Sequence, residues 1–266
     1  MQPKRAPIVR TLLVSFLFLA TGCHRAAQAP APTVTTPQVA GTPAPSFQSP
    51  SGKLYARTRV GPADDDEPFI IRPVPPGAAP NTDSFNGTAR MAAKLSVASG
   101  TPQTFSDLGA VLDSLIPDEQ MRAMNISKGA DSGRLPEEQT AVAVTAFLYA
   151  SSRESDNDFH CIVGLDPGQP ARFMNVEVSA LPPSSSPFFG ALRAARDQFK
   201  AFFTAGGDAL PVRGYDKYDP PIPIQVTGSL FFDVDHVPPA VGPVGMKPQT
   251  AWEIHPVSDI EFEAQP

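Results

Sequence analysis

The stretch AVAVTAFLY at residues 141–149 is an unbroken run of apolar and β-prone residues, and FHCIVGL at 159–165 is nearly as apolar. Runs of this length and composition are typical of strands that are buried on both faces. The polar stretch SSRESDND between the two runs predicts a turn. Two consecutive buried strands are therefore expected in the second half of the chain.

Three further strands are predicted downstream of this pair. RFMNVEVS at 172–179 alternates between polar and apolar residues, as a strand with two different faces does. IQVTGSLFFDV at 224–234 and the segment 252–262, which continues past Pro256, complete the set. The segment just before the fourth strand is expected to be a loop, since it is rich in proline. Its aromatic and turn-forming residues are Tyr215, Tyr218, Pro220 and Pro221.

Between the third and fourth strands, apolar residues recur at spacings of three and four, which predicts an amphipathic helix. The apolar positions are Phe188, Leu192, Ala195, Phe199 and Phe202. The charged residues are expected on the other, solvent-facing sides of the helix. These charged positions are Arg193, Arg196, Asp197 and Lys200. The pair Gly206-Gly207 should end the helix.

Three strands, one helix and two strands is the element order of an OB-type barrel, in which the helix covers one open end of a closed five-stranded sheet. Gly228 in the fourth strand suits the strong coiling of such a sheet. We therefore expect a mainly β domain with one central helix at residues 105–266, in the order β-β-β-α-β-β. An open α+β sheet is the alternative. A short helix, capped by Ser106 and ended by Pro117, should open the domain.

The N-terminus has the successive parts of a secretory signal peptide. Positive charges come first, at Lys4, Arg5 and Arg10, and an apolar run covers residues 12–20. This run is shorter than the about 20 residues that cross the ~30 Å hydrocarbon core, so a transmembrane anchor is not expected. The ending Ala-Thr-Gly-Cys resembles the bacterial lipobox. Residues 1–22 should therefore be removed and lipid attached to Cys23.

Behind the lipidated cysteine, a tether is expected to precede the domain. Residues 23–50 are rich in Ala, Pro, Thr and Gln, with too few large apolar residues to offset the entropy of ordering them. Residues 51–104 are expected to be poorly ordered or only partly added to the domain, because prolines interrupt their short apolar runs. The acidic run at 64–67 is expected to be a solvated loop rather than a calcium site.

Charge and cysteine content exclude some classes of protein. The formal net charge is −6, and removal of the three positive residues of the signal peptide lowers it to −9. Binding to a phosphate backbone needs clustered Lys and Arg, so nucleic acid is not an expected partner. Cys161 is the only cysteine besides Cys23, so no intramolecular disulfide is expected after lipidation. Cys161 alternates with apolar neighbours and is expected in the core.

Acidic residues and histidines gather on the predicted strands. Alternate residues of a strand share a face, so Asp158 should point with His160, and Glu253 with His255. The fourth strand has an acidic end that also carries a histidine, and Glu177 lies opposite its apolar neighbours on the third strand. The candidate metal ligands are therefore Asp158, His160, Asp233, His236, Glu253 and His255.

These residues have two interpretations. Neutral imidazole and carboxylate together suit Zn²⁺ or Mn²⁺, so the pattern fits a divalent-metal site. A carboxylate beside a half-buried histidine also commonly serves only to satisfy its ring nitrogens. Structural hydrogen bonding is the preferred interpretation and a divalent metal the alternative, so no cofactor is required.

Three motifs occur in a fixed order around the predicted helix: ESDNDFH at 154–160, VTGSLFFDVDH at 226–236 and EIHPV at 253–257. Together they resemble a family of uncharacterised exported bacterial proteins that carry ESDxDxH, VTGxxFFDxxH and E[IL]HPV. The resemblance covers about residues 105–262. It implies a shared domain and no particular reaction. This chain has Cys161 where that family usually has leucine.

Two functions from different classes fit the sequence. The preferred one is a lipid-anchored, non-enzymatic cell-envelope module that binds a protein, a glycan or a small ligand, or supports an assembly. The alternative is a divalent-metal-dependent phosphodiesterase or nuclease-like hydrolase on an OB-type barrel. His24 follows the lipidated Cys23. It is not the Asp that retains lipoproteins in the inner membrane of enteric bacteria, which implies the outer membrane if the source is Gram-negative.

Overall fold

The computed structural model describes residues 46–61, 83–236 and 241–264. This part of the chain is mainly β, with eight strands in a single sheet and few helices. In chain order the elements are β1 (Ser46–Gln48), β2 (Leu54–Gly61), α1 (Met91–Lys94), β3 (Gln103–Thr104), α2 (Leu108–Ser114), α3 (Asp118–Ala123), η1 (Pro136–Glu138), β4 (Ala141–Arg153), β5 (Phe159–Gly164), β6 (Phe173–Val178), α4 (Phe189–Thr204), β7 (Tyr215–Phe232) and β8 (Trp252–Phe262). None of these helices is long and apolar enough to cross a membrane.

Five of the strands form a closed ring. The sheet order is β1-β2-β7-β8-β6-β5-β4-β3, and an additional pairing of β7 with β4 closes β4, β5, β6, β8 and β7 on themselves. Within the ring β6 and β8 run parallel, and the other pairs are antiparallel. The predicted order of three strands, a helix and two strands is therefore found at β4, β5, β6, α4, β7 and β8.

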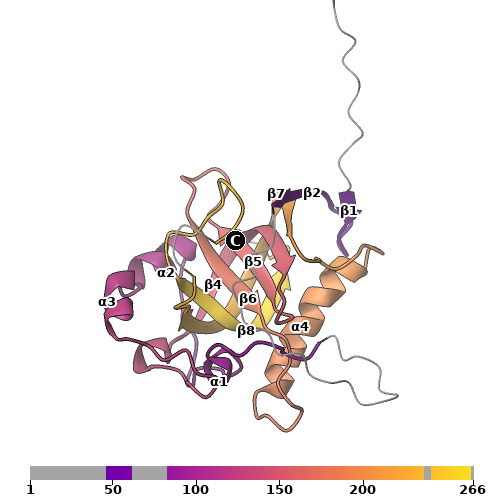
Figure 1. The fold of residues 1–266 in the computed structure, drawn as a ribbon. Helices are drawn as coiled ribbons and strands as arrows, with labels where there is room; N and C mark the ends of the chain where they lie inside the picture. Colours follow the sequence, from indigo (N-terminus) through magenta and orange to yellow (C-terminus); the bar gives the residue numbers. More distant parts are fainter. Residues whose placement is uncertain (1–45, 62–82, 237–240, 265–266) are drawn as a thin grey trace, which may run out of the picture. The chain divides into compact units, whose positions relative to one another are not determined.

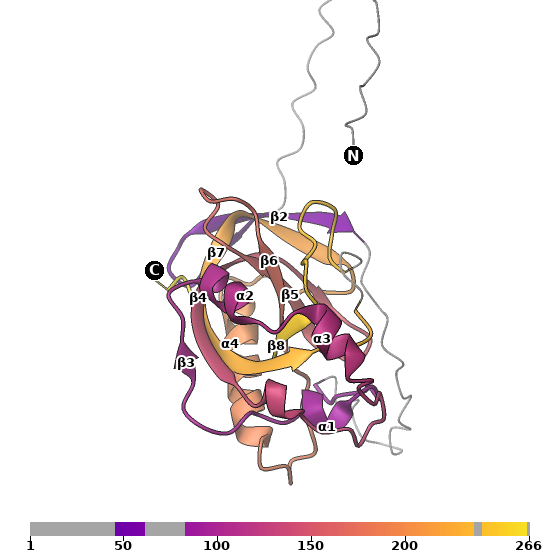
Figure 2. The same cartoon turned by 90° about the vertical axis from the view of Figure 1, so that its left-hand side faces the viewer.

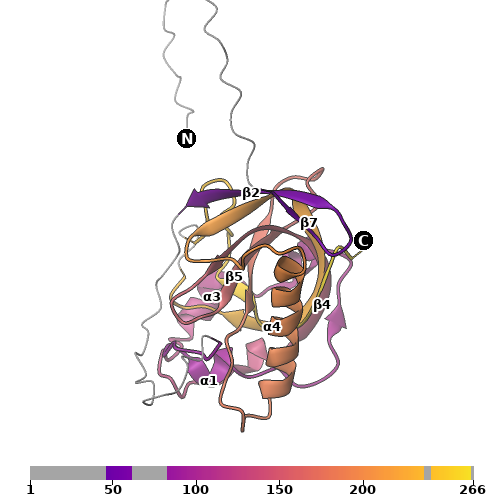
Figure 3. The ribbon, with the colours of Figure 1, turned by 90° about the vertical axis from the view of Figure 1, so that its right-hand side faces the viewer.

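Helices cover two opposite sides of the ring. Helix α4 packs against β8 and β6, and it lies across the ring from α2 and α3 (Figures 1 and 2). Figure 3 shows the full length of α4 beside the ring.

The N-cap of α2 is Asp107, whose carboxylate accepts from Ala110 N at 2.9 Å, so the expected cap at Ser106 is wrong by one residue.

Strand β7 is longer than expected, because the segment predicted to be a loop belongs to it. Its first residues pair with β2 on one side, up to Asp219, and with β4 on the other. The β4–β7 register shifts between Leu148 and Ala150, and Pro220 and Pro221 fall in this shift. These prolines therefore interrupt no hydrogen-bonded ladder to β4, and the chain can stay extended through them.

The residues before position 105 also contribute to the sheet and to the core. Strand β1 lies within the segment expected to be a tether, and Phe47 at its centre is buried. The Phe47 ring lies 5.9 Å from that of Phe202 and 5.5 Å from that of Phe203, both on α4. Strand β2 adds Tyr55, whose hydroxyl donates to Glu263 Oε1 at 2.9 Å. Residues 1–45 and the acidic run 64–67 lie outside the described residues.

The apolar face of α4 agrees with the predicted spacing, with one correction. Leu192, Phe199 and Phe202 are buried, and Phe188, the residue before the helix, is partly buried, whereas Arg193 is exposed. Arg196, however, is only 1% exposed, so its predicted place in solvent is wrong. Arg196 follows Leu192 by four residues and precedes Phe199 by three, so helical geometry places it on the apolar stripe. Its charge is met there by Asp83, 3.0 Å from Nε.

Candidate metal centre

The alternation of the ring strands sorts their side chains onto two faces. Cys161, Val176 and Ile254 belong to the hydrophobic core enclosed by the ring. The residues directly before and after each of these on its own strand therefore point to the opposite face of the sheet. There His160 of β5 is paired in register with Glu177 of β6, and Asn175 of β6 with Glu253 of β8.

Segments outside the ring bury this second face. Helix α1 lies over it, since the Arg90 guanidinium is 4.7 Å and the Lys94 ammonium 5.9 Å from the centroid of the Phe231 ring. The Phe231 ring in turn lies 5.3 Å from the ring of His255. Residues after β7 add Asp233 and His236. A polar cluster is therefore enclosed between the sheet and the segments that precede and follow the ring strands.

Glu177 lies at the middle of the cluster, between two imidazoles. Its Oε1 is 3.1 Å from His160 Nδ1, and its Oε2 is 2.9 Å from His255 Nδ1. The other ring nitrogen of His255, Nε2, lies 3.3 Å from Asp158 Oδ2. The second oxygen of Asp158 accepts from Ala180 N at 2.5 Å, which fixes the carboxylate toward the histidine.

A second group of contacts surrounds Glu253 and adjoins the first. His236 Nδ1 lies 2.8 Å from Glu253 Oε1 and 3.6 Å from Asp233 Oδ2. Glu253 Oε2 is 3.6 Å from His255 Nδ1, so this carboxylate faces histidines of both groups. The rings of His160 and His236 are 5.6 Å apart. Lys94 contributes an ammonium 3.5 Å from Asp233 Oδ2.

The ligand-type atoms are buried, and many of them lack hydrogen bonds. None of these four carboxylates and three imidazoles is more than 4% exposed. Among the described residues, both ring nitrogens of His160 and of His255 have no partner with hydrogen-bond geometry, although carboxylate oxygens lie near them. The same holds for one oxygen each of Asp158, Asp233 and Glu253. Each buried polar atom without a hydrogen bond lowers the stability of the folded state by about 1–3 kcal/mol.

The carboxylates set the pKa values of the three histidines. Burial alone would lower the pKa of His160, but Glu177 outweighs it and raises the pKa to about 9. Burial is also outweighed at His236, where Asp233 and Glu253 raise the pKa to about 10. The pKa of His255 is raised as well, mainly by the charge of Glu177. The carboxylates of the cluster therefore favour the positively charged form of all three histidines.

The acids respond in the opposite direction. Burial would raise the pKa of Glu177, but the charges of His255 and His160 hold it well below its usual range. The pKa of Asp233 is lowered to about 2, because His236 and Lys94 outweigh its burial. Asp156, buried at the edge of the cluster, has a raised pKa because of desolvation and the nearby charge of Asp158.

All six candidate ligands expected from the sequence are brought together, from three strands and the chain flanking them. Asp158 and His160 come from the start of β5, Glu253 and His255 from β8, and the remaining pair follows β7. Glu177 is not among these six, although strand parity places it on the polar face of β6, where it pairs with His160. Lys94 was missed because it lies on a four-residue helix in a segment expected to be poorly ordered.

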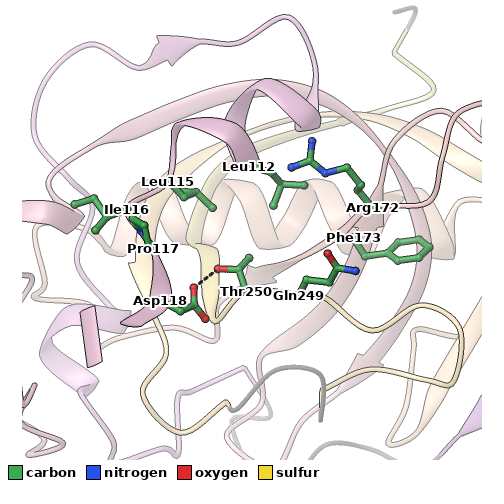
Figure 4. Close-up of a pocket in the computed structure, with 9 residues that line it drawn as sticks. All are labelled: Leu112, Leu115, Ile116, Pro117, Asp118, Arg172, Phe173, Gln249 and Thr250. Atoms are coloured by element: carbon green, nitrogen blue, oxygen red, sulfur yellow. Dashed lines mark hydrogen bonds between the residues drawn. The ribbon is translucent and has the colours of Figure 1, made fainter. Parts of the chain in front are cut away.

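A surface pocket of about 220 Å³ lies elsewhere on the molecule, between α2 and the loop before β8 (Figure 4). It is lined by Leu112, Leu115, Asp118, Arg172 and Thr250, among others. Its charged groups are already paired within the chain. Asp118 accepts from Thr250 Oγ1 at 2.6 Å, and Arg172 lies 2.7 Å from Asp113. The pocket therefore offers no unpaired charge for a ligand.

Comparison with protein-family models, with curated proteins and with solved structures returns no match.

Proposed function

We propose that this chain is a lipid-anchored cell-envelope protein whose folded domain is a non-enzymatic binding module, and that it binds a divalent metal ion at its buried cluster. One observation carries the proposal. The ring nitrogens of His160 and His255 are fully buried beside carboxylate oxygens, yet they make no hydrogen bond among the described residues. A cation placed among these atoms would turn unmet contacts into coordination bonds.

The residue types agree with this chemistry. The ligand atoms of Asp158, Glu177 and His255 all lie within 4.8 Å of one another. A set of imidazole nitrogen and carboxylate oxygens suits Zn²⁺ and Mn²⁺ in particular. The carboxylates that raise the pKa of the histidines would equally favour a cation, and the ion would then take the place of the protons.

The fold that holds the cluster is proposed to be an OB-type barrel. The closed ring, the parallel pairing of β6 with β8 and the position of α4 between β6 and β7 support this assignment. Gly228 supports it further, because a Cβ there would lie 2.6 Å from a methyl carbon of Ile254 and from Pro256 O. Only glycine allows β7 and β8 to approach so closely at this register shift.

The membrane anchor is proposed from the sequence of residues 1–23. A positive start, an apolar run and Ala-Thr-Gly-Cys support export and lipid attachment to Cys23. The outer membrane is the proposed location if the source is Gram-negative. A segment rich in Ala and Pro would then separate the lipid from the sheet. The proposed partners are the membrane, the metal ion, and a protein, glycan or small ligand that the module binds.

A metal-dependent hydrolase is the less favoured function. Such an enzyme needs a ligand position open to substrate and arginines beside the acids to neutralise a transferring phosphate. The cluster residues are at most 4% exposed. The nearby Arg90 is committed to Glu138 at 2.7 Å, and Arg172 is paired with Asp113. These contacts favour binding over phosphodiester hydrolysis.

Metal analysis of the full chain, purified in detergent without an affinity tag, tests the proposal. After dialysis against Zn²⁺ or Mn²⁺ and removal of free ion, elemental analysis should find bound metal in the native protein. His255→Gln should lose it, while Asp113→Asn, a change at an exposed position outside the cluster, should retain it. A native protein that holds no metal at saturating concentrations would return the cluster to purely structural hydrogen bonding.

A further inference from the structure

The buried cluster contains two separate sets of ligands. The first triad consists of Asp158, Glu177 and His255, and the second triad of Asp233, His236 and Glu253. Within each triad the ligand atoms lie within 4.8 Å of one another, and the two triads share no residue. Each triad supplies one imidazole and two carboxylates, which is enough for the protein's share of one tetrahedral site.

Glu253 connects the two triads. Its Oε1 is 2.8 Å from His236 Nδ1, and its Oε2 is 3.6 Å from His255 Nδ1. The two oxygens of one carboxylate thus face histidines of different triads. A carboxylate in this position can coordinate one ion with each oxygen, and ions in two-metal sites typically lie about 3.5–4 Å apart.

His160 stands beside both triads without belonging to either. Its Nδ1 is 3.1 Å from Glu177 Oε1 of the first triad, and its ring is 5.6 Å from that of His236 in the second. Both of its ring nitrogens are buried and make no hydrogen bond among the described residues. It is therefore a further nitrogen ligand within reach of the space between the triads.

The charges of the cluster are compatible with more than one ion. The two triads contain four carboxylates, and Lys94 places one ammonium beside Asp233. With neutral imidazoles, one divalent ion and this ammonium would leave the cluster negative in a buried site. A second divalent ion would turn this single negative charge into a single positive one, so the buried charge imbalance is no larger with two ions than with one.

We infer that the cluster is a dinuclear centre, in which one divalent transition-metal ion is held by the first triad, a second by the second triad, and Glu253 bridges them. This inference rests on the proposed function, since it assumes that the cluster binds metal at all. His160 completes the coordination of the ions in the space between the triads.

Titration of the native full chain with Mn²⁺ tests the inference without any substitution. Elemental analysis should give two ions per chain. Electron paramagnetic resonance of the loaded protein should show the exchange-coupled signal of two bridged Mn²⁺ ions, in place of the six-line signal of an isolated one. One ion per chain with an isolated signal would overturn the dinuclear centre and leave the proposed function intact. No bound ion would overturn both.

Two variants assign the ions to the triads. Asp233→Asn together with His236→Gln should lower the content from two ions to one and abolish the coupling, because only the second triad is removed. Glu253→Gln keeps the shape of the bridging group and should also remove the coupling. Asp113→Asn should keep two coupled ions. If the variants do not fold, as circular dichroism would reveal, the result for the native chain still decides the question.

Discussion

The guanidinium carbon of Arg196 lies 4.5 Å from the centroid of the Phe159 ring. Arg196 also donates to the carbonyl oxygens of Ser179 and Asn157 and pairs with Asp83, so its charge is fully met inside the fold. The Phe159 ring stacks on the Phe199 ring, with their centroids 4.6 Å apart, and both residues belong to the hydrophobic core. The arginine thus packs into the same interior as the aromatic stripe of α4.

Substitutions on α4 should separate buried from exposed positions. Phe199→Ala should lower the free energy of unfolding by about 3–5 kcal/mol, because the lost transfer energy adds to a cavity. Arg196→Ala should cost about 2 kcal/mol, because it leaves buried acceptors unmet. Arg193→Ala, at a side chain 63% exposed, should cost less than about 0.5 kcal/mol and serves as the control. Equal losses for Arg196→Ala and Arg193→Ala in urea unfolding would contradict the packing of Arg196.

Asp83 should make stability depend on acid pH. Burial would raise its pKa, but hydrogen bonds from Lys200 and Arg196 outweigh this and lower the pKa. A lowered pKa gives stability that is present above the pKa of an unfolded aspartate, about 3.9, and is lost as the pH falls through the folded value. Asp83→Asn should therefore show a smaller loss of unfolding free energy between pH 6 and pH 3 than the native chain. Parallel curves for the two proteins would exclude a role for Asp83.

The residues before position 105 should be required for a stable domain. Residues 46–61 supply Phe47 and Tyr55 to the core, and α1 supplies Lys94 to the cluster. A fragment of residues 46–266 should unfold cooperatively, whereas 105–266 should unfold at a clearly lower urea concentration or precipitate. Equal unfolding midpoints for the two fragments would place the domain boundary at residue 105 after all.

Metal should stabilise the chain only through the cluster. An ion that binds the folded state alone adds about 2.7 kcal/mol at a free concentration 100 times its Kd. Zn²⁺ should therefore raise the Tm of the native protein, and a chelator should reverse the effect. His160→Gln should show a smaller rise. A native Tm unaffected by Zn²⁺ would favour the purely structural interpretation.

Cys23→Ser should abolish lipid labelling of the exported chain. Without the thiol no diacylglycerol can be attached, so the precursor should remain uncut or be released from the membrane. Labelling with a radioactive or alkyne-modified fatty acid, followed by membrane fractionation, measures this directly. Cys161→Ser is the matched control, because Cys161 is buried in the core and should leave labelling unchanged. A Cys23→Ser protein that still partitions with membranes like the native one would disprove lipid anchoring.

Much of the ring could be predicted from local sequence pattern. Strands β4, β5, β6 and β8 lie close to the expected segments because each is a continuous or alternating apolar segment that ends near turn-forming residues. The carboxylate–histidine pairs of β5 and β8 could be placed on a common face for the same reason. Their assembly around Glu177 could not, because it depends on the register between strands that are distant in the sequence.

Other features left little local signal. Phe47 is one aromatic residue in a stretch dominated by small and polar ones, and its burial depends on a partner, α4, about 150 residues away. The prolines at the start of β7 indicate a loop, but the register shift between β4 and β7 accommodates them within the strand. Arg196 carried two conflicting signals: its charge predicts a solvent-facing position, whereas its spacing from Leu192 and Phe199 predicts a buried one, which is the position observed.

The ring has one seam that is weaker than the rest. Strands β6 and β8 are joined by two residue pairs, Asn175↔Glu253 and Val176↔Ile254, whereas β4 and β7 share ten. Glu253, a carboxylate of the cluster, therefore lies on the shortest ladder of the ring. An ion held in the cluster would exchange no faster than the segments that cover it, α1 and the residues after β7, move away from the sheet. Such an ion would behave as a slowly exchanging constituent of the fold, acquired once near the time of folding, rather than as cargo in rapid equilibrium with its surroundings.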